Sequence, residues 1–216
     1  MALYHEYLTD DREFKDYKDL KANCRFKTPE NFNFAYDIVD RYTITEPNKR
    51  AMVWIDDNGE EHTFTFEDIS RESKRAAYFF TTLGIKKGDA VMLMLRRRYE
   101  WWWIMMALHR IGAIAVPATT QLLAHDIEYR NNAAEIKMIV TADIPELPAE
   151  IEKTLSSCPS VKLLMTVGQK REGWIDFHEE VVKHSPEFPR PVGDLATHNE
   201  EPMLMYFTAG TSGYPK

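Results

Sequence analysis

The last 14 residues of the chain join an apolar run to a loop of small, hydroxyl-bearing and basic residues. Residues 203–207 predict a buried strand, and residues 208–216 read Thr-Ala-Gly-Thr-Ser-Gly-Tyr-Pro-Lys. Hydroxyls and backbone N–H groups donate hydrogen bonds to phosphate oxygens, glycines let the backbone come close, and a lysine offsets negative charge. The segment therefore predicts a phosphate-binding loop; the alternative is a surface turn rich in small residues.

Two common phosphate-binding motifs do not fit this loop. The Walker motif has four residues between its glycines and a hydroxyl residue after its lysine. Here only two residues separate Gly210 from Gly213, and no hydroxyl residue follows Lys216. The dinucleotide-binding pattern G-x-G-x-x-G is also absent from the loop. A P-loop kinase or GTPase is therefore not indicated.

The order of residues in the loop closely resembles the phosphate-binding signature of the adenylate-forming superfamily, T-S-G-T-T/S-G-x-P-K. Ala209 departs from it, since the superfamily usually has Ser there, which removes one hydroxyl but leaves the backbone N–H. The positions that match are Thr208, Gly210, Thr211, Ser212, Gly213, Pro215 and Lys216.

Segments upstream resemble the same superfamily and are most similar to its medium-chain acyl-CoA synthetase branch. They are residues 31–37, 99–103, 109–113, 117–122 and 126–130. The resemblance implies an α/β fold with a largely parallel sheet flanked by helices, forming the N-terminal part of an acyl-CoA synthetase large domain. Residues 1–30 are expected to be a polar, partly helical leader, and residues 31–216 the N-terminal portion of the adenylate-forming domain.

The resemblance implies that the complete enzyme joins a carboxylic acid to coenzyme A, using ATP and Mg²⁺ and passing through an acyl-adenylate. Medium-chain, acetic and aromatic acids all stay open as substrates. Hydroxyls would contact the β and γ phosphates, and the glycines would let backbone N–H groups come close to the phosphates. The lysine would partly neutralise the triphosphate. The residues implied in ATP phosphate binding are Thr208, Ala209, Gly210, Thr211, Ser212, Gly213 and Lys216.

The adenine, acyl and catalytic-lysine sites of the superfamily lie beyond this motif. The catalytic residues are therefore expected after Lys216, whose ammonium group here lies beside a terminal carboxylate. The isolated chain is expected to be inactive and to bind ATP weakly or not at all. Two alternatives remain: a non-catalytic truncated paralogue, and an adenylate-former with an acceptor other than coenzyme A.

Composition limits the partners of the chain. It has 27 Lys and Arg against 34 Asp and Glu, which gives a net charge of −7 and argues against nucleic acid as a partner.

No signal peptide, transit peptide or membrane-spanning run is evident, so a cytoplasmic location is expected. Cys24 and Cys158 are expected to be free thiols, although a disulfide stays open, and no metal site is indicated. An incomplete domain would also expose apolar surface and favour self-association.

Alternating strands and helices must position the loop. A strand at 51–55, an Asn-Gly turn and a second segment at 62–66 predict a hairpin, and Thr65 with Asp68 predicts a capping box. Residues 90–95 are apolar throughout, as in a strand buried on both faces. Further predicted strands are 113–116, 136–141 and 161–167, and predicted helices are 32–42, 69–83, 99–111, 123–134, 149–157 and 174–184. Alternation predicts a parallel sheet whose carboxyl edge receives the loop.

Several other groups have a structural interpretation. The run Arg96–Arg98 and the acidic turn at 56–61 are interpreted as solvated, and residues 185–199 as a surface linker. The three tryptophans at 101–103 are interpreted as core. His109 and Arg110 are given a structural role at a helix end, and neither His178 nor His184 is expected to be catalytic.

Overall fold

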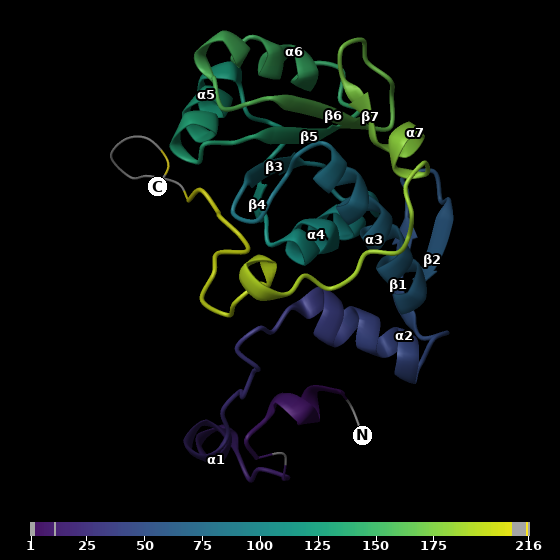
Figure 1. Cartoon of the computed structure of the whole chain (residues 1–216), viewed down its shortest axis with the longest axis vertical. Helices are drawn as coiled ribbons and strands as arrows, with labels where there is room; N and C mark the ends of the chain where they lie inside the picture. Colours follow the sequence, from purple (N-terminus) through teal and green to yellow (C-terminus); the bar gives the residue numbers. More distant parts are fainter. Residues whose placement is uncertain (1–2, 11, 209–214, 216) are drawn as a thin grey trace.

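The main sheet of the molecule is five-stranded and wholly parallel, in the order β4-β3-β5-β6-β7 (Figure 1). The computed structural model describes residues 3–10, 12–208 and 215. The strands are β3 (Ala90–Met94), β4 (Ile114–Pro117), β5 (Met138–Ala142), β6 (Leu163–Val167) and β7 (Ile175–Asp176). The prediction of an α/β fold with a largely parallel sheet is confirmed.

Helices cover both faces of this sheet. One face packs against α3 (Phe66–Thr82), α4 (Glu100–Ile111) and α7 (Phe177–Val181), and the other against α5 (Ala124–Ala133) and α6 (Leu147–Glu152), which the 3₁₀ helix η3 (Leu155–Ser157) follows. Val91 and Leu93 of β3 belong to the first layer, and Met92 and Met94 to the second. Every residue of β3 and β5 is therefore buried, which explains their unbroken apolar sequences.

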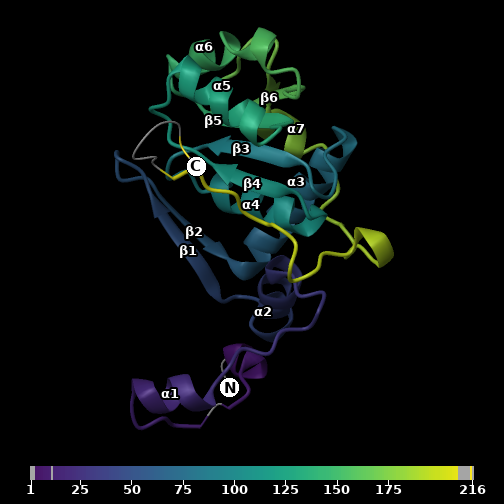
Figure 2. The ribbon, with the colours of Figure 1, turned by 90° about the vertical axis from the view of Figure 1, so that its left-hand side faces the viewer.

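The antiparallel hairpin of β1 (Arg50–Ile55) and β2 (Glu61–Thr65) lies beside the main sheet (Figure 2). In its turn the Asp56 carboxylate accepts the N–H groups of Asn58 and Glu60, and Gly59 takes the left-handed φ of 83°. Thr65 and Asp68 then cap α3 reciprocally. The predicted hairpin and capping box are confirmed.

The described residues before β1 form four short helices. They are η1 (Leu3–Tyr7), α1 (Tyr17–Asn23), the π-helix η2 (Ala35–Asp40) and α2 (Arg41–Thr45). Leu8 and Phe26 form a single antiparallel bridge, so the segment before Lys27 folds back on itself. The helix predicted at 32–42 begins later, because the Asn33 side chain accepts the Ala35 N–H.

The helix predicted at 174–184 is wrong over its first part. Ile175 pairs with Met165 and adds the edge strand β7 to the sheet. The Asp176 carboxylate then accepts the Glu179 N–H, so that the helix begins only at Phe177.

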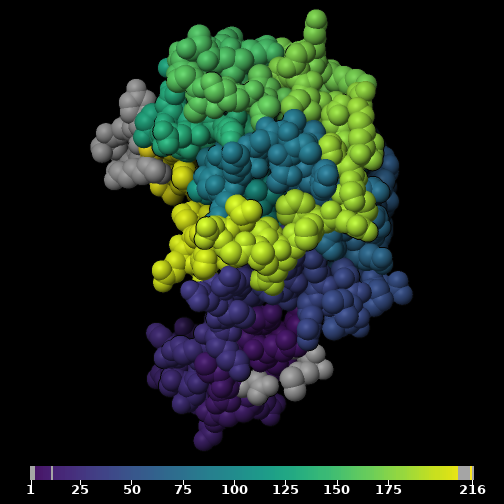
Figure 3. Space-filling view, in the orientation of Figure 1, coloured from purple at the N-terminus to yellow at the C-terminus, as the bar shows by residue number. Residues whose placement is uncertain are grey.

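Residues 185–202 run along the surface between the α3–α4 layer and the N-terminal segment (Figure 3). Arg190 forms an ion pair with Asp37, and the Asn199 N–H donates to the Glu30 carbonyl at 3.0 Å. Lys87 Nζ donates to the Ala196 carbonyl at 2.6 Å, just after the 3₁₀ helix η4 (Gly193–Leu195). The predicted surface linker is thus exposed over most of its length but fixed at several points.

The core interpretation of the three tryptophans is wrong for Trp102, which is 49% exposed. Trp101 and Trp103 are half-buried, and the Trp103 ring packs edge-on against Phe64 of the hairpin. The first turns of α4 lie beside the hairpin, whereas its last eight residues, from Ile104 to Ile111, are all buried.

Candidate functional site

The chain enters the predicted loop alongside edge strand β4. The Ala115 N–H donates to the Met203 carbonyl and the Met205 N–H donates to the Ala115 carbonyl, each at 3.0 Å. These bonds make Leu204 a single parallel bridge to Ala115. The chain therefore runs in the same direction as the strands, toward their carboxyl edge, as predicted.

The prediction of a buried strand at 203–207 is wrong in extent and burial. Beyond the bridge no further ladder pairing is formed by the described residues of this segment, and Met203 and Tyr206 are 41% and 59% exposed. The reason is its edge position, since β4 pairs with it on one side and no described strand lies on the other. Met205 and Phe207 are half-buried against the α5–α6 layer.

Most residues assigned to phosphate binding lie outside the described part of the chain. Ala209, Gly210, Thr211, Ser212, Gly213 and Lys216 belong to this group. Thr208 is described at the entry to the loop and Pro215 near its exit. The structure thus gives the position of the two flanks, and the phosphate contacts stay a prediction.

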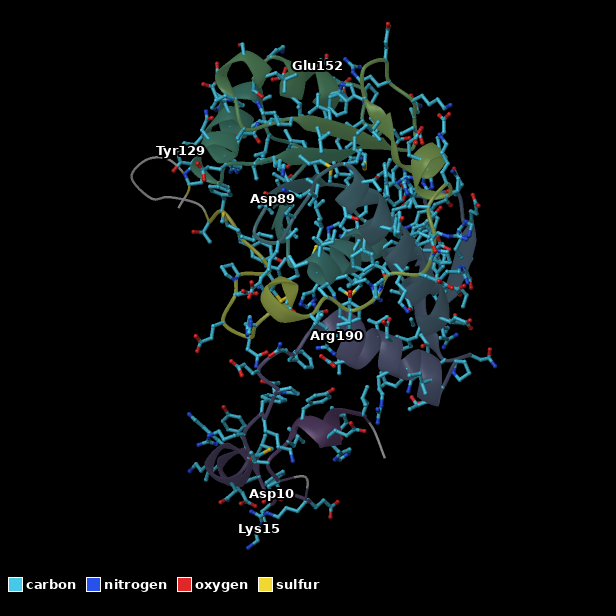
Figure 4. All side chains as sticks on the ribbon, viewed as in Figure 1. Asp10, Lys15, Asp89, Tyr129, Glu152 and Arg190 are labelled. Atoms are coloured by element: carbon cyan, nitrogen blue, oxygen red, sulfur yellow. The ribbon has the colours of Figure 1, made fainter. Side chains whose placement is uncertain are left out.

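Helix α5 contacts both flanks of the loop, and Figure 4 shows Tyr129 on the side where the C-terminal segment passes. The Tyr129 hydroxyl donates to the Pro215 carbonyl at 2.8 Å. The Phe207 ring lies edge-on to the Tyr129 ring, with centroids 6.2 Å apart, and 5.4 Å from the Arg130 guanidinium carbon. Sequence reasoning gave neither Tyr129 nor Arg130 a role, because they precede the loop by about 80 residues.

A second group of polar side chains lies at the carboxyl ends of β3, β4 and β5. Arg96 follows β3 with a left-handed φ of 52°, and its Nε donates to Thr120 Oγ1 at 3.2 Å. Arg96 and Arg97 are exposed, so the predicted solvated turn holds for them. It is wrong for Arg98, which forms ion pairs with Glu100 at 3.0 Å and with Asp143 at 3.1 Å.

The buried carboxylate of Glu100 is the centre of this group. Glu100 is fully buried, and its Oε1 lies 2.8 Å from His178 Nε2 of α7. Burial raises the pKa of Glu100, but hydrogen bonds from His178 and Arg98 outweigh it and hold the pKa below its ordinary value. This cluster was missed because its partners are far apart in sequence, and nothing in their spacing reveals it.

The other end of α4 carries a second ion pair. Arg110, which is fully buried, binds Asp40 with both guanidinium nitrogens at 2.6 and 2.9 Å, and its Nε donates to Ser73. Burial raises the pKa of Asp40, but hydrogen bonds from Arg110 and Ser70 hold it below its ordinary value. Burial, aided by the Arg110 charge, lowers the pKa of His109 to about 4. Arg110 and His109 are both buried at the end of α4, which agrees with the structural role that the sequence indicated for them.

Metal ligands are not grouped in the described ranges. Among residues 3–10, 12–208 and 215, no three His, Cys, Asp or Glu side chains are arranged to hold an ion. Cys24 and Cys158 are both free thiols. No helix in the same ranges combines the length and the apolar composition that crossing a bilayer requires.

Comparisons with known proteins identify the family. A family profile described as AMP-binding enzyme matches residues 40–216. The chain therefore belongs to the AMP-binding enzyme family, and the relatives it matches include several named as acyl-coenzyme A synthetases.

Two relatives illustrate the coverage. The chain is 36% identical over 195 residues to acyl-coenzyme A synthetase ACSM5, mitochondrial, from Rattus norvegicus, covering 87% of this chain and 33% of the relative. It is 34% identical over 212 residues to acyl-coenzyme A synthetase ACSM3, mitochondrial, from Homo sapiens, covering 95% and 35%. The chain thus spans about a third of the length of these relatives.

Solved structures agree in fold. An acyl-CoA synthetase from Brucella canis superposes with a TM-score of 0.71 at 28% identity, covering 86% of this chain and 32% of that one. The anthranilate CoA ligase AuaEII, solved in complex with anthranoyl-AMP, superposes with a TM-score of 0.76 at 24% identity, covering 87% and 34%. The second likeness concerns the fold alone.

Proposed function

We propose that this sequence is the N-terminal third of an ATP-dependent ligase that joins a carboxylic acid to coenzyme A. The observation that carries the proposal is the match of residues 40–216 to the AMP-binding enzyme profile, which includes the predicted loop. Residues 1–30 then form a leader, and residues 31–216 the first part of the adenylate-forming domain. A cytoplasmic location is part of the proposal, although the relatives named above are mitochondrial.

The reaction has two steps. A carboxylate oxygen of the acid attacks the α-phosphorus of ATP, a P–O bond breaks, and pyrophosphate leaves, giving the acyl-adenylate. The sulfur of coenzyme A then attacks the acyl carbon, AMP leaves with the electron pair of the broken C–O bond, and the thiol proton passes to solvent. The net products are acyl-CoA, AMP and pyrophosphate.

The loop serves the first step by binding the triphosphate. Thr208, Thr211 and Ser212 donate hydroxyl hydrogen bonds to the β and γ phosphates, and Lys216 offsets part of their charge. Gly210 and Gly213 let backbone N–H groups approach. The contribution to rate is orientation and charge stabilisation rather than covalent chemistry.

Magnesium is expected with ATP, but the described residues offer no set of ligands for it. No residue of this chain is proposed to hold the ion. The residues that bind adenine, the acyl chain and coenzyme A are proposed to follow Lys216. The 216-residue chain alone is accordingly proposed to form no acyl-adenylate and to self-associate through surface that the rest of the domain would cover.

The proposal is tested with a polypeptide translated past Lys216 from the genomic reading frame. Acid-dependent exchange of labelled pyrophosphate into ATP is measured with acetate, octanoate and benzoate in turn. We expect exchange with at least one acid, and a decrease of about tenfold or more in Thr211→Val, which keeps the side-chain shape but loses a hydrogen bond to charged phosphate.

The other outcomes separate the alternatives. Exchange without any acceleration of AMP release by coenzyme A would identify an adenylate-former with another acceptor. A stop codon directly after Lys216 would favour a non-catalytic remnant. A full-length product that folds but shows no exchange with any acid would contradict the proposed function.

A further inference from the structure

A cavity of about 270 Å³ lies beside the start of β4 and is separate from the predicted phosphate-binding loop. Gly112, which closely precedes β4, lines it together with the end of α4 and the segment 197–203, which is drawn in yellow next to α4 in Figure 1. The predicted loop follows at the opposite, carboxyl end of β4. The apolar part of the cavity wall consists of Phe32, Phe34, Ala113, Pro202 and Met203.

One buried side chain joins the walls of this cavity. Asn33 is 1% exposed and stands between Phe32 and Phe34 in the sequence. Its Nδ2 donates to the His109 carbonyl of α4 at 2.8 Å and to Thr197 Oγ1 at 3.1 Å. The walls are therefore fixed relative to one another before any ligand binds, and such preorganisation lowers the cost of ordering a site.

His109 supplies an unpaired hydrogen-bonding side chain to the cavity wall. It is 9% exposed, and among the described residues its Nδ1, which is shielded from water, has no hydrogen-bond partner. The acidic side chain in the same wall is already occupied, because Glu201 is paired with Lys87 at 2.6 Å. His109 is thus the side chain from which we expect recognition of a ligand.

The protonation state of His109 determines what it can recognise. Burial, aided by the Arg110 charge, lowers the pKa of His109 to about 4, so the ring is neutral at pH 7 and carries one N–H group. Buried N–H groups without an acceptor are rarer in proteins than acceptors without a donor, so we assign the proton to Nε2 and the lone pair to the unpartnered Nδ1. The ring then has one donor to offer to a ligand.

The size and charge of the cavity narrow the class of ligand further. A dry cavity of about 150 Å³ holds one benzene molecule. A cavity of about 270 Å³ therefore has room for a six-membered ring with a short substituent. Neither neutral His109 nor Glu201, paired with Lys87, gives the wall a positive charge that would favour a carboxylate.

We propose that this cavity binds a small, neutral aromatic molecule with a carbonyl group. The carbonyl oxygen accepts the His109 Nε2–H group, and the ring packs against Phe32, Phe34 and Met203. The site goes beyond the proposed function, because it uses neither the predicted loop nor any residue after Lys216. Its ligand is accordingly distinct from the carboxylic acid and from ATP.

The test measures dissociation constants by ligand-observed NMR at pH 7, with full-length protein and without ATP or coenzyme A. Acetophenone is the probe, and ethylbenzene has a similar shape but no oxygen. We expect acetophenone to bind His109→Leu about fivefold more weakly than wild type, which corresponds to one ordinary hydrogen bond. Ethylbenzene is expected to bind both proteins equally, because it makes no such bond.

His198→Leu is the matched control. His198 lines the same cavity, but its Nδ1 lies 3.9 Å from a Glu30 carboxylate oxygen and its side chain is 42% exposed. We expect this variant to bind acetophenone like wild type. No binding of acetophenone to wild type, equal binding to His109→Leu, or an equal loss of ethylbenzene in that variant would overturn the proposal. Displacement of acetophenone by benzoate would also contradict it, since a carboxylate is not expected in this site.

A second readout uses only the wild-type protein. Nitrogen-15 NMR of the histidine rings distinguishes a protonated from an unprotonated ring nitrogen. We expect His109 to show a protonated Nε2 and an unprotonated Nδ1, and acetophenone to shift the Nε2 signal of His109 while leaving that of His198 in place. A protonated Nδ1, or a shift confined to His198, would show that His109 is not the group that recognises the ligand.

Discussion

The two ends of helix α4 both bury charge, but they do so in different ways. At its C-terminal end Arg110 is fully buried and binds Asp40 through two nitrogens, with Ser73 taking a third hydrogen bond. At its N-terminal end the fully buried group is Glu100, and its partners Arg98 and His178 are partly exposed. The first end is largely closed to water, since Arg110 is buried and the Asp40 side chain is 18% exposed, whereas the second opens onto the carboxyl edge of the sheet.

This difference determines what each end can tolerate. Removing Arg110 from the closed pair leaves the Asp40 charge largely shielded from water, whereas the partners of Glu100 in the open cluster can turn toward solvent. The closed end therefore fixes how α3, α4 and the π-helix pack, and the open end joins α4 to α7 and to the segments that follow β3 and β5.

The largest effect is expected from Arg110→Met at the closed end. The change removes the guanidinium that binds both Asp40 oxygens and leaves Asp40 with Ser70 and with the longer Lys74 ion pair at 3.4 Å. Breaking a largely buried pair in this way lowers the free energy of unfolding by about 3–5 kcal/mol. The free energy of unfolding in urea is measured for the single variant and for the double variant Arg110→Met with Asp40→Leu, and the two values are compared. The double variant is expected to recover much of the loss, and a double variant as unstable as the single would contradict this reading.

The next effect is the pH dependence contributed by His109. Burial lowers its pKa from 6.5 to about 4, so between these values the unfolded state binds the proton and the folded state does not. The contribution is fully present above pH 6.5 and is lost as the pH falls toward 4, and the difference corresponds to about 3 kcal/mol of unfolding free energy. Urea unfolding at pH 7 and pH 4.5 should show a smaller loss in His109→Gln than in wild type. An equal loss would mean that His109 is protonated in the folded state.

A smaller effect is expected from Glu100→Gln at the open end. The variant keeps the shape but weakens the hydrogen bonds from Arg98 and His178, and the free energy of unfolding should fall by about 2 kcal/mol. Asp143→Asn is the matched control, because Asp143 binds the same arginine from an exposed position and its pair is worth about 0–1 kcal/mol. If the control variant were the less stable of the two, Glu100 would not be the centre of the cluster.

The same two ends show what could be predicted from sequence. The sheet, the hairpin and the capping box follow from apolar runs, an Asn-Gly turn and a Thr-x-x-Asp spacing, which are local patterns. The Glu100 cluster joins residues up to 78 positions apart, and the Arg110 pair joins residues 70 apart. No local pattern encodes such partners, which exist only once the chain has folded.

The candidate site divides in the same way. The loop signature was readable because its chemistry lies in nine consecutive residues. The contacts of Tyr129 with Phe207 and Pro215 were not readable, because they depend on where α5 lies beside the C-terminal segment. The strand predicted at 203–207 failed for a related reason, since its apolar residues gave no information about how many strands lie beside it.

The account depends most on the claim that the loop ending at Lys216 binds the β and γ phosphates of ATP. The direct measurement is calorimetric binding of ATP and of AMP to the full-length protein, in wild type and in Lys216→Met. We predict that the variant loses about tenfold or more in affinity for ATP while its affinity for AMP, which lacks both phosphates, changes little. Equal affinity of the two proteins for ATP, or an equal loss for ATP and AMP, would contradict the account.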